Sequence, residues 1–215
     1  MNKKSWSVGR SLLAAGILLL AARGTVAQAL KEGSEYKLLK PAVATGVAPG
    51  KVEVVEAFWY ACGHCYLLEP KLEAWDAKGR APYVQLVRLP ATWNDTVKTH
   101  ARVFYTIELL GKPQLHNEVF REINVKGNRL DTPEKIESFL TARGVTKTDF
   151  QKTFNGFAVE SKLARAADLN KRYRISSTPT VVINGKYVTD VGMAGGEEQL
   201  FQTINALAAQ DKPKG

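Results

Sequence analysis

The residues FWYACGHC at positions 58–65 contain both cysteines of this 215-residue chain, separated by two residues. The apolar run VEVVEAF at 52–58 leads into them and predicts a strand. An apolar stripe at steps of three and four residues follows, typical of an amphipathic helix: Cys65, Leu68, Leu72 and Trp75. The sequence therefore places the cysteine pair between a strand and a helix, with Cys62 at or just before the helix N-terminus.

This position favours redox chemistry at the cysteines. Unpaired backbone N–H groups and the positive end of the helix dipole stabilise a thiolate, which is the form that attacks disulfides. A structural metal site needs about four ligands, and the chain offers two cysteines and three histidines, with His100 and His116 in a distant helical stretch. An inert structural disulfide is the other alternative, but closing so small a loop removes little entropy from the unfolded chain. We therefore predict a redox-active cysteine pair and no metal site.

The first 27 residues have the order of a secretory signal peptide. Lys3, Lys4 and Arg10 precede an apolar run over 12–22, and small residues follow at 27–29. The run is too short to span a bilayer comfortably, which makes an uncleaved anchor the lesser alternative. We expect cleavage after Ala27 or Ala29. Export places the cysteines in an oxidising compartment, and we expect the bacterial periplasm.

Cleavage there changes the charge of the protein. It removes four basic residues and no acid, so the formal net charge falls from +9 to +5. That modest balance, without a cluster of basic and aromatic residues, gives no indication of a nucleic-acid partner.

Strand patterns occur on both sides of a long helical stretch. We expect strands at 35–39, 83–89, 179–183 and 186–188. The last two are joined by Asn184-Gly185, which supplies the positive φ angles of a tight hairpin turn. We expect a glycine-rich loop through Gly192, Gly195 and Gly196, and then a final helix over 197–207.

The residues from 94 to 157 contain four short helical patterns and no strand signal. One of these helices begins at Asp131-Thr132-Pro133-Glu134, where a capping side chain precedes a proline in the first turn. A longer helix over 159–173 follows. We therefore expect an α/β domain from 28–93 and 158–215, interrupted by an all-helical insertion at 94–157.

This order of elements resembles the thioredoxin fold, and within the thioredoxin superfamily it is most similar to the DsbA-like periplasmic dithiol oxidases. The resemblance covers nearly the whole chain after the signal peptide. It depends on the signal peptide itself, the residues EAFWYACGHCY at 56–66, the helical insertion, and Ser177-Thr178-Pro179-Thr180. A C-x-x-C motif alone is a weak signal, whereas its combination with these features is specific. The implied fold is a thioredoxin fold with an inserted all-helical domain.

The resemblance also implies roles for individual residues. Cys62 is expected to be the exposed nucleophile and Cys65 the more buried resolving thiol. Pro179 is expected to be a cis-proline beside the cysteines, with the backbone of Thr178 free to pair with a substrate strand. A trans proline at the start of an edge strand is the alternative.

Glu56 matches the family's buried acid, six positions before Cys62. A central parallel strand is apolar on both faces, so a lone carboxyl group there should have a raised pKa. We expect Glu56 to accept the proton when Cys65 attacks. The alternative for Glu56 is a solvated glutamate on an exposed face of the strand. We interpret Glu53 in that way. The aromatic residues Trp59, Tyr60 and Tyr66 either border a substrate-binding surface or pack in the core.

The residues between the cysteines depart from the family pattern. DsbA-like proteins commonly have Pro-His there, whereas Gly63-His64 matches protein disulfide isomerases. The resemblance implies that His64 stabilises the reduced Cys62 thiolate. We expect a redox potential between those of the two groups.

These observations predict a monomeric protein disulfide oxidoreductase that donates its Cys62–Cys65 disulfide to reduced, unfolded exported proteins. A membrane partner resembling DsbB would reoxidise it, and no cofactor other than the cysteine pair is implied. An isomerase or reductase of the same fold is the nearer alternative. A copper-binding dithiol module is more distant, because the only methionines are Met1 and Met193.

Overall fold

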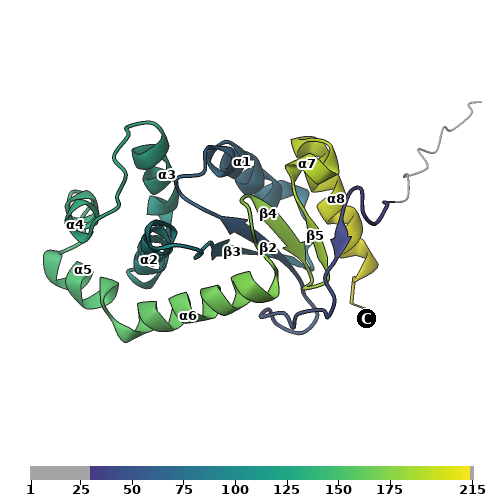
Figure 1. Ribbon diagram of the computed structural model, residues 1–215, viewed down its shortest axis with the longest axis horizontal. Helices are drawn as coiled ribbons and strands as arrows, with labels where there is room; N and C mark the ends of the chain where they lie inside the picture. The colour runs from purple at the N-terminus through teal and green to yellow at the C-terminus, as the bar shows by residue number, and fades with distance from the viewer. Residues whose placement is uncertain (1–29, 214–215) are drawn as a thin grey trace, which may run out of the picture.

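The computed structural model describes residues 30–213, which contain a five-stranded sheet in the order β1-β5-β4-β2-β3. The strands are β1 (Lys37–Leu38), β2 (Val52–Phe58), β3 (Val84–Pro90), β4 (Thr180–Ile183) and β5 (Tyr187–Thr189). Strand β2 lies between a parallel neighbour, β3, and an antiparallel one, β4 (Figure 1). The sheet is therefore mixed, whereas the sequence had suggested a central parallel strand. The predicted signal peptide lies outside the described residues.

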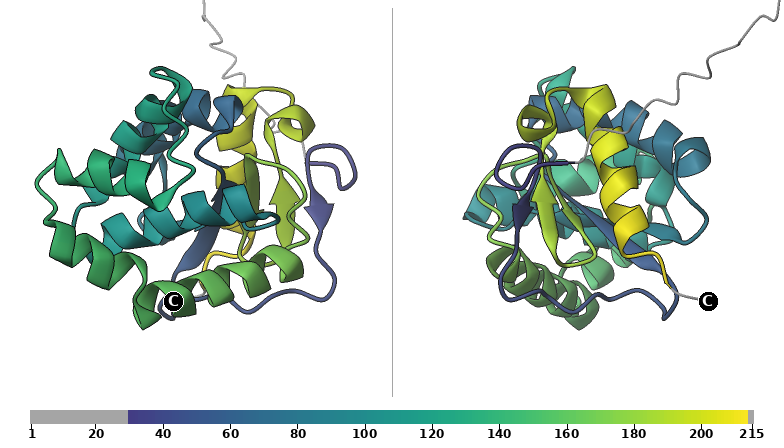
Figure 2. Two further views of the ribbon diagram at one scale, coloured as in Figure 1. Left: turned by 60° about the vertical axis from the view of Figure 1, so that its left-hand side comes forward. Right: turned by 90° about the vertical axis from the view of Figure 1, so that its right-hand side faces the viewer.

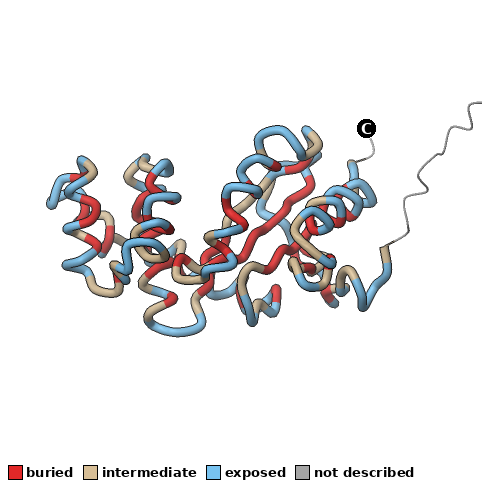
Figure 3. The backbone as a smooth tube through the Cα atoms, turned by 90° about the horizontal axis from the view of Figure 1, so that it is seen from above, coloured by how far each residue is buried: buried red, intermediate tan, exposed pale blue. Residues whose placement is uncertain are grey.

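Every residue of β2 is buried, because helices cover both faces of the sheet. Side chains alternate between the two faces of a strand. Val52 and Val54 belong to the core shared with α1 and α8, whereas Val55 belongs to the core shared with α2 and α6. Figure 3, coloured by burial, shows buried backbone running through the middle of the molecule. Glu56 must therefore face α1, and Glu53 must face α6.

The helices form two groups: one covers one face of the sheet, and α2 and α6 of the other contact its opposite face (Figures 1 and 2). One group comprises α1 (Gly63–Ala74), its π-helical continuation η1 (Trp75–Gly79), α7 (Val191–Ala194) and α8 (Glu197–Gln210). The other comprises α2 (Asp95–Leu109), the 3-10 turn η2 (Pro113–Leu115), α3 (His116–Asn124), α4 (Pro133–Thr141), α5 (Lys147–Phe154) and α6 (Phe157–Arg172). No helix between residues 30 and 213 is both long enough and apolar enough to cross a membrane.

The helices predicted between residues 94 and 157 are present as α2 to α5. Asn94 caps α2 by accepting the N–H of Val97, and Thr132 caps α4 with Pro133 in the first turn, as its sequence predicts. Figure 1 shows these helices to one side of the sheet, with the long α6 returning the chain to it. The boundaries 94–157 and 158–215 follow these elements closely, although they remain a prediction as domain limits.

The C-terminal part of the fold shows one confirmed turn and one correction. Asn184 and Gly185 have φ angles of 50° and 64°, the positive values that the hairpin requires. A Cβ on Gly185 would lie 1.9 Å from the carbonyl oxygen of Val43, so only glycine fits there. The loop predicted through Gly192 instead contains the short helix α7, because Asp190 accepts the N–H of Met193 and caps it.

Candidate active site

Cys62 is the N-cap residue of α1. Its sulfur accepts the backbone N–H of Cys65 at 3.3 Å, as a capping side chain does. The pKa of Cys62 is lowered to about 5, first by hydrogen bonding from the Cys65 side chain and also by the backbone N–H groups of Cys65 and His64, against an opposing effect of burial. The predicted position at the helix tip is confirmed. A half-buried sulfur with this pKa is largely a thiolate at neutral pH.

The Thr178–Pro179 peptide bond is cis, which confirms that prediction. The Cys62 thiol donates to the carbonyl oxygen of Thr178 at 3.3 Å, a contact that is available only to the protonated sulfur. Thr178 and Pro179 also line a cavity of about 340 Å³ with His64 and Leu67. Leu67 is 61% exposed, so this side of the cysteines presents an apolar surface to solvent.

Cys65 is fully buried, and burial raises the pKa of its thiol well above the usual range. Glu56 is also fully buried, and no described residue hydrogen-bonds to its carboxyl group. Burial, followed by the charge of Glu69, raises the pKa of Glu56 to about 8. The structure therefore places a proton-holding carboxyl group behind the resolving thiol, as predicted, although its role in catalysis stays a prediction.

Two charged residues near Glu56 were missed from the sequence. Arg88 is its register partner on β3, and Arg88 forms an ion pair with Glu69 of α1. Glu69 is 2% exposed and follows Cys65 by four residues, on the same face of the helix. The signal that could have revealed Glu69 was a carboxylate next to the apolar stripe of this helix.

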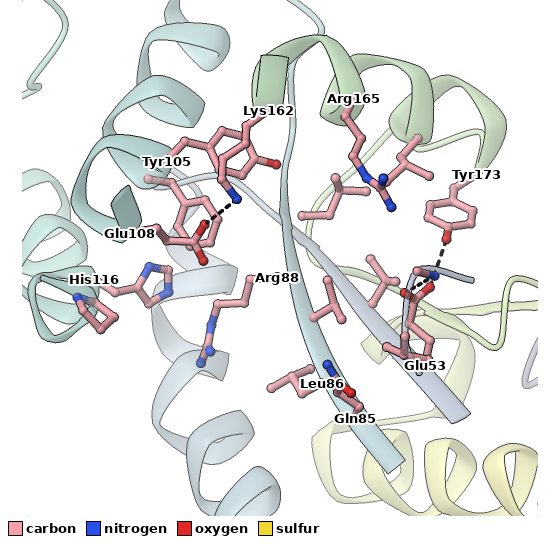
Figure 4. A pocket seen from close by; sticks show the side chains of 18 of the residues that line it. Glu53, Gln85, Leu86, Arg88, Tyr105, Glu108, His116, Lys162, Arg165 and Tyr173 are labelled. Carbon is pink, nitrogen blue, oxygen red and sulfur yellow. Dashed lines mark hydrogen bonds and ion pairs between the residues drawn. The ribbon is translucent and has the colours of Figure 1, made fainter. Parts of the chain in front are cut away.

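Our interpretation of Glu53 was wrong. Its side chain is buried, 4% exposed, on the face of β2 opposite Glu56. One carboxyl oxygen accepts the backbone N–H of Gly46 at 2.9 Å, and the other accepts the hydroxyl of Tyr173 at 3.2 Å (Figure 4). Two donors make its burial tolerable, whereas Glu56 has none among the described residues.

The two residues between the cysteines are exposed. A Cβ on Gly63 would meet no described atom within 4 Å, so the local structure does not require glycine there. The backbone N–H of His64 helps to lower the pKa of Cys62, while the His64 side chain makes no hydrogen bond or ion pair within residues 30–213. The predicted effect of the His64 imidazole on the thiolate therefore stays a prediction.

The other two histidines lie close to the cysteine stretch, not far from it. The indole N–H of Trp59 donates to Nδ1 of His100 at 2.9 Å, and the hydroxyl of Tyr60 lies 2.7 Å from Nδ1 of His116. Tyr60 is therefore a core residue, whereas Trp59 is half-buried. In the described part of the chain, no three histidine, cysteine or acidic side chains group so that they could hold a metal ion.

A reactive cysteine at a helix tip, a buried partner three residues further on and a cis-proline beside the first sulfur define a thiol:disulfide oxidoreductase of the thioredoxin superfamily. Comparison with known proteins gives the same result. A family model described as "DSBA-like thioredoxin domain" matches residues 53–208, and the chain belongs to that family.

Curated relatives and solved structures agree with this assignment. The thiol:disulfide interchange protein DsbA of Pseudomonas aeruginosa is 38% identical over 207 residues, covering 94% of this chain and 97% of the relative. The protein of the same name from Pseudomonas syringae is 36% identical over 206 residues, covering 95% and 94%. Among solved structures, P. aeruginosa DsbA has a TM-score of 0.78 at 39% identity, covering 83% of this chain and 93% of that one. The oxidoreductase DsbA from Xylella fastidiosa has a TM-score of 0.78 at 28% identity, covering 85% and 97%.

Proposed function

We propose that this oxidoreductase works as a dithiol oxidase, donating the Cys62–Cys65 disulfide to reduced, unfolded exported proteins. The observation that carries the proposal is the difference between the two sulfurs. Cys62 has a pKa of about 5 at the tip of α1, whereas burial raises the pKa of Cys65. A low pKa makes Cys62 a good leaving group and stabilises the reduced protein, so the disulfide tends to be passed on.

The transfer balances without a further reactant. A client thiolate attacks Cys62 of the oxidised protein, the Cys62–Cys65 bond breaks, and Cys65 leaves as a thiolate that takes up a proton, for which Glu56 is the proposed donor. A second client thiolate then attacks the client sulfur of the mixed disulfide and releases Cys62 as a thiolate. Two electrons pass from two client thiols to the cysteine pair. No cofactor takes part in this scheme.

The apolar surface around Leu67, Thr178 and Pro179 is the proposed contact for clients, with the Thr178 backbone pairing with an extended client segment. Unfolded chains expose the apolar side chains that such a surface accommodates. We further propose that the protein acts as a monomer in the periplasm, and that a membrane protein resembling DsbB reoxidises it. The names of the relatives, thiol:disulfide interchange proteins, support the chemistry of this proposal.

The test is oxidation of reduced ribonuclease by the pre-oxidised protein, followed by alkylation of free thiols. We expect wild type to transfer one disulfide per molecule, and Cys62→Ser to transfer none. Cys65→Ser cannot form the internal disulfide and should not oxidise ribonuclease. Its remaining sulfur, Cys62, should instead attack an oxidised client and stay bound to it as a mixed disulfide. Trapping the redox state of the cysteine pair in cells shows whether the protein oxidises or reduces its clients. An oxidase is found mostly in the disulfide form, and a protein found mostly in the dithiol form would contradict the proposal.

A further inference from the structure

The buried cysteine, Cys65, and three charged or titratable side chains behind it form one group. Glu56 and Arg88 are register partners on neighbouring strands, and Cys65 and Glu69 lie one turn apart on α1. The ion pair between Glu69 and Arg88 connects the helix to the sheet. The charge that Glu56 and Cys65 face therefore depends on where the Glu69 carboxylate is held.

His116 lies against this ion pair from the helical insertion. It is the first residue of α3, and Nε2 of its ring lies 3.6 Å from the second carboxyl oxygen of Glu69. The other ring nitrogen, Nδ1, lies 2.7 Å from the Tyr60 hydroxyl. The imidazole therefore connects the aromatic residue two positions before Cys62 to the acid four positions after Cys65.

The two contacts of the ring favour the neutral tautomer that carries its proton on Nε2. An ionised carboxylate can only accept, so the ring N–H that faces Glu69 is on Nε2. In the neutral ring, Nδ1 then accepts from the Tyr60 hydroxyl, which is its nearest polar neighbour. Edge-to-face contacts with Phe58, Phe104 and Phe120, at centroid distances of 5.1–5.7 Å, hold the ring in this orientation.

The ring also lies at the wall of a cavity of about 590 Å³, beside β3 and the insertion (Figure 4). Arg88 and Glu73 line the same cavity. The titratable or charged groups around His116 are Tyr60, Glu69 with its partner Arg88, and three residues that line the same cavity: Glu73 of α1, and Tyr105 and Glu108 of α2. Glu108 is paired with Lys162 of α6.

We propose that His116 is a positioning residue for disulfide exchange: braced by Tyr60, its ring holds Glu69 on Arg88 and so keeps the ion pair beside Glu56 and Cys65 closed. The proposal rests on the disulfide-exchange function of the cysteine pair proposed above. Burial opposes ionisation of Glu69, yet its pKa is lowered, because His116 and Arg88 both favour the carboxylate. At 3.6 Å the contact is longer than a hydrogen bond, and neither Nε2 of His116 nor Oε2 of Glu69 has another partner among the described residues. Loss of the imidazole removes the only nitrogen that faces this oxygen.

The test compares pH profiles of single-turnover oxidation of a two-cysteine peptide by pre-oxidised protein. His116→Phe retains the aromatic packing and removes both polar contacts. Without the imidazole, Glu69 takes up a proton at higher pH and releases Arg88, so the acid limb of the profile should move to higher pH, with a roughly tenfold lower rate on that limb. His116→Gln, whose amide can both donate and accept, should restore most of the wild-type profile.

His100→Gln is the matched control. His100 also belongs to the insertion and holds the neighbouring aromatic residue, Trp59, but it does not contact Glu69. We expect its profile to match wild type even if its unfolding temperature falls. A separate readout is the side-chain carboxyl signal of Glu69 in ¹³C NMR, whose titration midpoint should rise in His116→Phe and stay unchanged in His100→Gln.

The outcomes separate the two claims. If wild type does not oxidise the peptide, the proposed function fails. If wild type is active and His116→Phe has the same pH profile and the same Glu69 titration as wild type, the positioning role is overturned. It is also overturned if His100→Gln shifts the profile and the titration as much as His116→Phe does. If His116→Phe does not fold, Tyr60→Phe decides, because it removes only the hydroxyl that braces the ring and should shift the acid limb in the same direction by a smaller amount.

Discussion

Trp59 donates its indole N–H to Nδ1 of His100 at 2.9 Å, while Nε2 of the same ring lies 2.8 Å from the carbonyl oxygen of Arg129. One buried imidazole thus joins the stretch before Cys62 to the segment between α3 and α4. The pairing requires a neutral ring, with Nδ1 accepting and Nε2 donating. Burial lowers the pKa of His100 and keeps it in that form.

Replacing His100 by alanine should lower the free energy of unfolding by about 1–3 kcal/mol, because it leaves the Trp59 N–H and the Arg129 carbonyl without partners. Denaturant titration measures this loss. Below pH 6.5, the ordinary His value, the unfolded chain binds a proton that the folded chain does not, so wild type loses stability there and the variant loses less. In a double-mutant cycle with Trp59→Phe, strictly additive effects would show that the two side chains are not coupled.

Titration of the reduced protein, followed by thiolate absorbance, should give a pKa of about 5 for Cys62. The unfolded thiol has its ordinary value of 9.0, so the folded state binds fewer protons between these two pH values. The stability of the reduced protein should therefore rise with pH from about 5 to 9, and the contribution should be lost as the pH falls through 5. An ordinary cysteine midpoint in this titration would remove the driving force for disulfide donation.

Glu56→Leu should stabilise the protein and slow its chemistry. The folded carboxyl group keeps its proton up to a pH of about 8 and the unfolded one releases it near 4.5, so wild type loses stability as the pH rises between these values. At pH 8 and above, the variant should be more stable by about 5 kcal/mol, an order-of-magnitude value given by the rise of the pKa from 4.5 to about 8. If Glu56 exchanges a proton with Cys65, the step at Cys65 should slow by about 100-fold. Unfolding curves and single-turnover kinetics measure the two effects, and a variant that is stabilised but fully active would leave Glu56 without a catalytic role.

Tyr173→Phe tests the opposite face of β2. The substitution removes the hydroxyl that donates to Glu53 at 3.2 Å and should lower the free energy of unfolding by about 1 kcal/mol. Because Glu53 points away from the cysteines, we expect an unchanged Cys62 titration and unchanged peptide oxidation. An altered redox titration would mean that the two faces of β2 are coupled.

The sequence was sufficient for the parts of this protein that depend on near neighbours in the chain. The burial of β2 follows from its apolar run, the position of Cys62 from the strand-to-helix junction, and the hairpin at Asn184-Gly185 from local backbone preferences. Resemblance to a known family supplied the cis-proline, which no local pattern specifies.

The tertiary structure alone determined the surroundings of the buried charges. Glu53 and Glu56 belong to the same seven-residue strand and look alike in sequence, yet one receives two hydrogen bonds and the other receives none from the described residues. His100 and His116 come to the cysteine stretch from more than one helix of the insertion, across 41 and 56 residues of chain. Which partner a buried polar group meets depends on how distant segments pack. Side-chain alternation along one strand predicts the face on which a residue lies but not that partner.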